Sequence, residues 1–347
     1  MNEQDKRWTS YKETNKELPW RINRSLYTTL VSEIMLQQTT VGTVKNHFPL
    51  FIEKYSALEM LASIDEQQML KEWKGLGYYR RARNLLNAVK SISKNYNGII
   101  PLDYNKLVEI DGIGPYTANA ILAIGADKHV LALDANLERV LARFYGVKSE
   151  KGLKLQKELY SLFEEGRIAT EIKSIGGRDF NEGVMDIGRN ICMVKKAYCE
   201  LCPLRKDCYA LKNSVVADLP YQKEKKNDTK NLELHIVRFI VRKNNQVLAY
   251  RKSSSEWLSN QYEVPSFTLY CEESSFKQYP AITGDYFYYL QSFKSSITCY
   301  KIKNYVIEMS EQEFKSLGRN EQQFEYHEIL NGNLSTASSK AINLLYP

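Results

Sequence analysis

The sequence contains no apolar run that approaches the roughly 18 residues needed to cross a membrane. Its first ten residues, Met1 to Ser10, are polar and lack the apolar core of a secretory signal, so we do not expect secretion. Of its 347 residues, 43% are hydrophobic and 26% are charged, which excludes a wholly disordered chain. The net charge of +7 leans mildly toward polyanionic partners. These features predict a cytoplasmic protein of about two domains with no membrane partner.

Cysteine is scarce, and its distribution argues against a disulfide-stapled secreted domain, which would spread its cysteines along the chain. Four of the six cysteines fall in one segment with the spacing C-x6-C-x2-C-x5-C: Cys192, Cys199, Cys202 and Cys208. Four thiolates on one loop form the ligand set of a tetrahedral metal or of a cubane cluster. Zinc sites usually pair two short C-x2–4-C knuckles, and only one is present here. The spacing therefore favours a [4Fe–4S] cluster and leaves zinc as the alternative.

The remaining pattern divides the chain into a helical part and a strand-rich part. Apolar residues recur at helical spacing between residues 25 and 210, and turn signals separate these runs. Residues 222–231 are wholly polar and charged, as in an exposed linker. Short strand-like runs follow, and Asn244-Asn245 between two of them indicates a hairpin. We expect domains at 1–220 and 232–347, a cluster loop at 190–210 and a linker at 221–231.

One segment predicts contact with a polyanion. Gly112 and Gly114 bracket a tight turn, and Pro115 is well placed to open the following helix. Glycines let backbone N–H groups approach a phosphate, and a helix N-terminus adds partial positive charge. A helix–hairpin–helix motif grips a DNA backbone in this way without reading its sequence. A G-x-G turn also joins ordinary helices, so the segment gains its weight from the cysteine loop on the same chain.

A set of further motifs lies within residues 8 to 220: LPWR at 18–21, SEIMLQQT at 32–39, GLGYYRRARNL at 75–85, DGIGPYTANAI at 111–121 and LALDANLERVL at 131–141. With the cysteine loop, they resemble the MutY-type adenine DNA glycosylases of the helix–hairpin–helix superfamily. The resemblance implies a mainly α catalytic domain with a [4Fe–4S] loop, followed by an α+β Nudix-like domain. It also implies a monomer that acts in base excision repair, removing adenine paired with 8-oxoguanine or guanine from duplex DNA. In a bacterium, DNA binding would place it at the nucleoid.

Hydrolysis of an N-glycosidic bond requires two carboxyl groups in different environments. One is protonated to neutralise the leaving base, and the other is ionised to stabilise the cationic sugar. Glu33 precedes the apolar run Ile-Met-Leu, a setting in which its pKa would rise. The resemblance makes Glu33 the general acid and Asp134 the stabiliser of the sugar, and it adds Asn136 and Tyr116 to the catalytic group. In isolation, Glu33 would be a solvated helix carboxylate and Asp134 a helix N-cap. Asp134 can be a helix N-cap and stabilise the sugar at the same time.

Tyr116 distinguishes two sub-families. In the related endonuclease III-type enzymes, this hairpin position carries the lysine that forms a Schiff base and nicks the strand. A phenol cannot form that imine, so we expect a monofunctional glycosylase. The rival hypotheses are a thymine glycosylase for guanine:thymine mispairs and an inactive DNA-binding iron–sulfur protein. Glu33 argues against both, because thymine leaves more readily without a proton donor and an inactive protein has no use for one.

The resemblance also assigns DNA contacts, because a flipped base needs a pocket and the vacated stack needs a filler. Arg80, Arg81 and Arg83 are expected to form a phosphate-facing patch, with a solvated helix face as the alternative. Tyr79 is expected in the core. The other assignments are the base pocket (Trp20, Arg21, Leu36 and Glu182), the inserted residues (Gln38 and Tyr78) and the hairpin (Gly112 and Gly114).

The C-terminal part lacks the glutamate-rich helix with which a nucleoside diphosphate hydrolase holds its cations, so we expect no pyrophosphohydrolase activity. Residues 246–267 resemble the opening strands of the Nudix-like domain. In the family, this domain helps to recognise 8-oxoguanine through a Phe-Ser-His loop. That loop aligns with Phe293-Lys294-Ser295, or one residue later with Ser296, and its serine and histidine positions are not matched.

Overall fold

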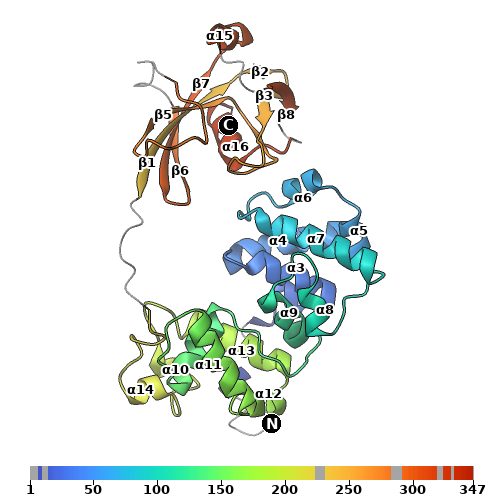
Figure 1. Cartoon of the computed structure of the whole chain (residues 1–347), viewed down its shortest axis with the longest axis vertical. Helices are drawn as coiled ribbons and strands as arrows, with labels where there is room; N and C mark the ends of the chain where they lie inside the picture. The colour runs from blue at the N-terminus through green and yellow to red at the C-terminus, as the bar shows by residue number, and fades with distance from the viewer. Residues whose placement is uncertain are drawn as a thin grey trace. The chain divides into compact units, whose positions relative to one another are not determined.

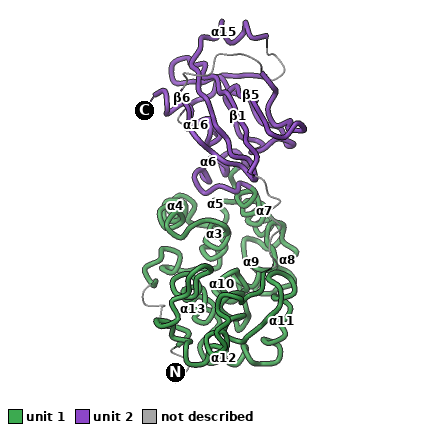
Figure 2. The backbone as a smooth tube through the Cα atoms, turned by 90° about the vertical axis from the view of Figure 1, so that its left-hand side faces the viewer, with its two compact units in different colours: residues 1–64, 80–225 green, residues 65–79, 226–347 purple. Residues whose placement is uncertain are grey.

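The computed structural model describes residues 7–9, 15–222, 231–282, 291–318, 323–329 and 332–346. The chain forms two compact units, which we call the helical unit (residues 1–64 and 80–225) and the sheet unit (residues 65–79 and 226–347; Figure 2). This division assigns residues 65–79 to the sheet unit, so the domain limits at 220 and 232 stay a prediction. Residues 223–230 of the predicted linker lie outside the described residues.

Helices make up most of the helical unit, as the apolar spacing predicted (Figure 1). Two of them pack around Trp8, whose ring centroid lies 5.0 Å from those of Phe144 and Phe180. Among the described residues, no helix is long and apolar enough to span a membrane. The helical segments are η1 (Pro19–Arg21), α3 (Leu26–Leu36), α4 (Val41–Lys54), α5 (Leu58–Ala62), α7 (Arg80–Asn95), α8 (Tyr104–Val108), α9 (Pro115–Ala120), the π-helical η2 (Ile121–Gly125), α10 (Ala135–Tyr145), α11 (Leu153–Glu164), α12 (Ala169–Ile175), α13 (Gly177–Asn190), η3 (Cys199–Leu201) and α14 (Tyr209–Lys212).

Capping fixes the start of two helices that carry predicted site residues. Helix α3 begins in a capping box, in which Ser25 Oγ accepts from the Thr28 N–H at 3.0 Å and Thr28 Oγ1 accepts from the Ser25 N–H at 2.8 Å. Helix α10 begins after Asp134, whose carboxylate accepts from the first backbone N–H groups of the helix. The unpaired N–H groups at each helix start therefore determine where these segments turn into helix.

The end of α3 is held by Arg81 of α7, which is buried. Its guanidinium donates to the carbonyls of Ile34 and Met35 at 3.0 and 2.7 Å and to Thr39 Oγ1 at 2.7 Å. The last carbonyls of a helix have no partner within the helix, so a buried cation there satisfies them. The prediction that Arg81 faces phosphate is therefore wrong, whereas Arg80 is exposed.

The predicted hairpin joins α8 to α9. Gly112 has φ of +92°, and a Cβ added there would lie 2.1 Å from the carbonyl oxygen of Asn84. The hairpin therefore requires glycine at this position. Gly114 is the N-cap of α9 with an ordinary φ of −89°, and a Cβ there would meet nothing within 4 Å. Pro115 opens α9, as the sequence predicted.

The sheet unit is an α+β arrangement of two four-stranded sheets (Figure 1). One has the order β5-β1-β7-β6, in which β1 and β7 run parallel and the other pairs are antiparallel. In the other, β3 pairs with β2, β4 and β8, and Asn244 makes the predicted hairpin between β2 and β3. The elements are α6 (Glu66–Glu72), β1 (Leu232–Ile240), β2 (Arg242–Lys243), β3 (Gln246–Arg251), β4 (Tyr262–Glu263), β5 (Ser266–Cys271), β6 (Gln291–Ile297), β7 (Tyr300–Glu308), α15 (Glu311–Ser316), β8 (Glu325–Glu328) and α16 (Thr336–Leu345).

Phe293, Lys294 and Ser295 do not form a loop but lie within β6, so this part of the prediction is wrong. They pair with β7 in antiparallel register, Lys294 opposite Lys303. Because successive side chains of a strand point to opposite faces, Lys294 and Ser295 face opposite sides. Lys294 is exposed, and Ser295 Oγ accepts from Asn304 Nδ2 at 2.8 Å.

Candidate active site

Nine of the predicted site residues line one cavity of about 580 Å³ in the helical unit. The cavity lies where α3, α9, α10 and α13 meet, and Ile124 of the π-helical turn η2 and Met185 add apolar surface to its wall. Segments more than a hundred residues apart therefore contribute to a single pocket. The nine residues are Trp20, Arg21, Glu33, Leu36, Gln38, Tyr116, Asp134, Asn136 and Glu182.

Glu33 is a buried carboxyl group with one hydrogen-bond donor. It is 6% exposed, and the Tyr116 hydroxyl donates to its Oε2 at 2.6 Å. Burial raises the pKa of Glu33 from 4.5 to about 7; the Tyr116 hydrogen bond opposes the rise, Asp134 and Glu182 add to it, and Arg24 opposes it. The predicted upward shift is therefore confirmed. A carboxyl group in this range can hold a proton near neutral pH and give it up.

Asp134 accepts three hydrogen bonds from the first turn of α10. The backbone N–H groups of Asn136 and Leu137 donate to Oδ1 at 2.9 and 2.7 Å, and Asn136 Nδ2 donates to Oδ2 at 2.8 Å. Burial raises the pKa of Asp134, while the hydrogen bonds from Leu137 and Asn136 hold it down. Asp134 is thus a helix N-cap that also faces the cavity. Ala135 is the first residue of α10, so this position does not need glycine.

A polar chain connects Asp134 to the cysteine loop. Asn136 Oδ1 accepts from Arg139 Nη2 at 2.9 Å, and Arg139 Nε donates to the Cys192 carbonyl at 2.6 Å. The sequence reasoning did not find Arg139, because an arginine in an amphipathic helix usually lies on the solvent face. The available signal is its position three residues after Asn136, which places both side chains on one face of α10.

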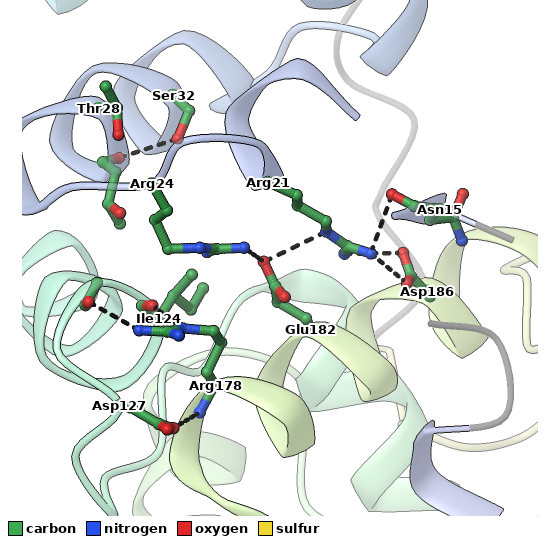
Figure 3. A network of polar contacts seen from close by, with 12 residues as sticks. Asn15, Arg21, Arg24, Thr28, Ser32, Ile124, Asp127, Arg178, Glu182 and Asp186 are labelled. Atoms are coloured by element: carbon green, nitrogen blue, oxygen red, sulfur yellow. Dashed lines mark hydrogen bonds and ion pairs between the residues drawn. The ribbon is translucent and has the colours of Figure 1, made fainter. Parts of the chain in front are cut away.

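Ion pairs hold the Glu182 side of the cavity (Figure 3). Glu182, 4% exposed, receives Arg24 Nη2 at 2.7 Å and Arg21 Nε at 3.2 Å on the same oxygen, Oε1. Arg21 also forms a bidentate pair with Asp186 at 2.8 and 3.2 Å. Asp186 further accepts from Arg189 at 3.3 Å. The sequence reasoning identified Arg21 and Glu182 but missed the rest. Its only local signal is that Asp186 follows Glu182 by four residues, which is one helical turn.

The four clustered cysteines lie close together in the helical unit. All four are free thiols and line a small cavity with Ile191, Leu211 and Val216. Arg143 Nη1 donates to Cys192 Sγ at 3.2 Å, and burial raises the pKa of Cys202 to about 11. Within the described ranges, no three or more His, Cys, Asp or Glu side chains are arranged to hold a metal ion. Four basic side chains of the loop are exposed: Lys195, Lys196, Arg205 and Lys206.

The remaining predicted residues do not line the large cavity. Gly112 and Gly114 lie in the hairpin. Tyr78, Lys294 and Ser295 belong to the sheet unit. Tyr78 is 63% exposed and has a φ of +46°, whereas Tyr79 beside it is buried, as predicted.

The sequence and the structure match known proteins. Residues 31–165 match the model of the HhH-GPD superfamily base excision DNA repair proteins. The chain is 37% identical over 247 residues to an adenine DNA glycosylase of Buchnera aphidicola from Acyrthosiphon pisum, covering 71% of this chain and 68% of that one. A thymine/uracil-DNA glycosylase of Methanothermobacter thermautotrophicus is 31% identical over 201 residues, which cover 58% of this chain and 89% of that one.

Among solved structures, a thermostable thymine-DNA glycosylase is similar, with a TM-score of 0.53 and 29% identity, over 60% of this chain and 95% of that one. The match with the Buchnera enzyme has the higher identity and extends over more of this chain than the match with the thymine/uracil enzyme. The residues that match the superfamily model include Glu33, Tyr116 and Asp134 of the cavity. The chain belongs to the adenine DNA glycosylases, a family of helix–hairpin–helix base excision repair enzymes that hydrolyse N-glycosidic bonds.

Proposed function

We propose that this protein is a monofunctional glycosylase that removes adenine mispaired with 8-oxoguanine or guanine in duplex DNA. The observation that carries the proposal is that Glu33 and Asp134 face one cavity with different hydrogen-bond environments. An adenine inside a duplex is out of reach of such a cavity, so it must be flipped out of the stack. The cavity, at about 580 Å³, has room for a base and part of its sugar.

Glu33 supplies the proton in the first step. Its Oε2 accepts from Tyr116, so the proton sits on Oε1 and passes to a ring nitrogen of adenine as the glycosidic bond breaks. The bonding electron pair leaves with the base, which departs neutral. Glu33 is then a carboxylate and can take a proton from the water that attacks the sugar. A pKa of about 7 suits both roles.

Asp134 stabilises the positive charge that develops on the sugar. Its three partners are N–H groups, which can only donate, so they favour the ionised carboxylate. Arg139 fixes Asn136, and Asn136 in turn fixes Asp134. The same carboxylate could form a transient covalent bond to the sugar, as the resemblance allows.

The absence of strand cleavage follows from Tyr116. By the resemblance, Tyr116 stands at the hairpin position that carries a lysine in endonuclease III-type enzymes, and burial raises the pKa of its hydroxyl well above its usual value. Among the described residues that line the cavity, none is a lysine. Lys128, which follows η2, donates to the Leu102 carbonyl at 2.6 Å.

We further propose that Cys192, Cys199, Cys202 and Cys208 hold a [4Fe–4S] cluster. The donor set fits: four free thiols share one mostly apolar cavity, and Arg143 supplies positive charge beside Cys192. The four exposed cations of the loop would contact DNA phosphates.

The sheet unit is proposed to be the Nudix-like domain that reads the base opposite adenine. Of the two residues predicted for this role, Lys294 is exposed, while Ser295 is hydrogen-bonded to Asn304. Lys294 is therefore the better placed to contact a lesion.

A single-turnover assay tests the function. Duplexes carrying 8-oxoguanine:adenine, guanine:adenine or guanine:thymine are incubated with excess enzyme, and products are resolved with and without hot alkali. Cleavage of the adenine strand only after alkali is expected, and faster cleavage opposite 8-oxoguanine would support lesion reading. Release from guanine:thymine alone would establish the thymine glycosylase, towards which the solved structure of a thymine-DNA glycosylase points. No release from any duplex would leave the inactive DNA-binding protein.

A further inference from the structure

Arg24 is a half-buried cation whose printed ion pair and hydrogen bond both go to Glu182, a residue that lines the cavity. It immediately precedes Ser25, the N-cap of α3, and its side chain is 11% exposed. Its Nη2 donates to Glu182 Oε1 at 2.7 Å. Arg21 also approaches Oε1, but its Nε makes no hydrogen bond and its two terminal nitrogens are engaged by Asp186. Arg24 is therefore the only hydrogen-bond donor to Glu182 among the residues that the structure describes (Figure 3).

This arrangement treats the two oxygens of Glu182 differently. Oε1 receives both guanidinium groups, while Oε2 has no hydrogen-bond partner among the described residues. Glu182 lines the same cavity as Glu33 and Asp134. A carboxylate oxygen accepts hydrogen bonds, so Oε2 can pair with an N–H or O–H of a ligand that fills the cavity. Adenine has such a donor in its exocyclic amine.

We propose that Arg24 is a positioning residue for base selection, a role that rests on the proposed function. By holding Oε1, Arg24 keeps Glu182 turned so that Oε2 accepts from the exocyclic amine of adenine. A base without that amine leaves a buried acceptor unpaired and is released more slowly.

Arg24 cannot be replaced by Arg21 in this role. Without Arg24, Glu182 keeps only Arg21, which is shared with Asp186 and reaches it through Nε at 3.2 Å. The carboxylate is then free to rotate and offer either oxygen to Arg21. The pair also influences Glu33: apart from burial, the main cause, Glu182 raises the pKa of Glu33 and Arg24 lowers it. Arg24 and Glu182 therefore act on the general acid in opposite directions.

The test compares two substrates that differ only in the amine. Single-turnover rates are measured on duplexes with adenine or purine opposite 8-oxoguanine, for the wild type, Arg24→Gln, Arg24→Lys, Glu182→Gln and the double variant Arg24→Gln/Glu182→Gln. Arg167→Gln is the matched control, because Arg167 lies exposed over Tyr145 and away from the cavity. Thermal midpoints of all variants show whether each one folds.

Arg24→Gln is expected to slow adenine release at least about tenfold and purine release less than about threefold, so that the preference for adenine falls. Arg24→Lys keeps the charge and should recover part of the preference. The double variant should prefer adenine over purine at least as strongly as Glu182→Gln does, because Arg24 acts through Glu182. Arg167→Gln should match the wild type.

Three results would overturn the role of Arg24 and leave the proposed function standing. They are equal slowing on both substrates, an unchanged preference for adenine in folded Arg24→Gln, and additive losses of that preference in the double variant. A wild type that releases no adenine from any duplex would overturn the proposed function, and the role of Arg24 with it.

Discussion

Replacing Glu33 with glutamine should abolish catalysis and at the same time stabilise the protein at alkaline pH. Burial lifts the pKa of Glu33 from 4.5 to about 7, a rise of about 2.5. Below pH 4.5 the carboxyl group is protonated in both the folded and the unfolded state, so it does not change the free energy of unfolding with pH. As pH rises, the unfolded chain ionises first and the folded state loses stability until its own carboxyl ionises. At about 1.4 kcal/mol per pKa unit, the loss reaches about 3 kcal/mol by pH 8.

Glutamine at position 33 keeps the shape and can still accept from Tyr116, but it never ionises. The variant should therefore match the wild type near pH 4.5 and exceed it by about 3 kcal/mol at pH 8, or roughly 6–12 °C in Tm. Scanning fluorimetry across pH 4.5 to 8.5 measures this difference. Glu164→Gln is the control, because Glu164 is exposed and its removal should leave Tm nearly unchanged at every pH. The reasoning would be refuted if the Tm of Glu33→Gln did not rise above that of the wild type with increasing pH, or if it were lower at pH 8.

Three further outcomes are expected. The single-turnover rate of the wild type should fall as pH rises through about 7. Tyr116→Phe should move this fall in rate to higher pH, because the variant lacks a hydrogen bond that lowers the pKa of Glu33. A pH–rate profile that is the same in both proteins would contradict this. Gly112→Ala should cost about 1–3 kcal/mol or more through its positive φ and the clash with Asn84, whereas Gly114→Ala should leave Tm unchanged; equal costs in denaturant titrations would contradict it. Cys202→Ser should lose the visible iron–sulfur absorption with lower solubility and weaker DNA binding; normal binding without the chromophore would count against the cluster's proposed role.

The sequence was most informative where one residue type meets a local demand. Gly112 was predictable because the hairpin needs a positive φ, and Asp134 because a carboxylate suits the start of a helix. Residues whose role depends on distant partners were not predictable in this way. Arg81 was misassigned to phosphate because nothing in its own segment shows that α3 ends beside it. The strand that contains Lys294 was missed because its register with β7 is set across the sheet.

The two catalytic candidates differ less in burial than in their donors. Burial raises the pKa of both Glu33 and Asp134, so it cannot by itself make one an acid and the other an anion. Glu33 has a single donor, the hydroxyl of Tyr116, and a second oxygen left for a proton. Asp134 has N–H donors on both oxygens, three in all, and each of these hydrogen bonds favours the ionised carboxylate over the protonated acid. The division of labour therefore comes from the start of α10: a helix N-terminus supplies backbone donors in pairs, and a side chain such as Tyr116 supplies only one.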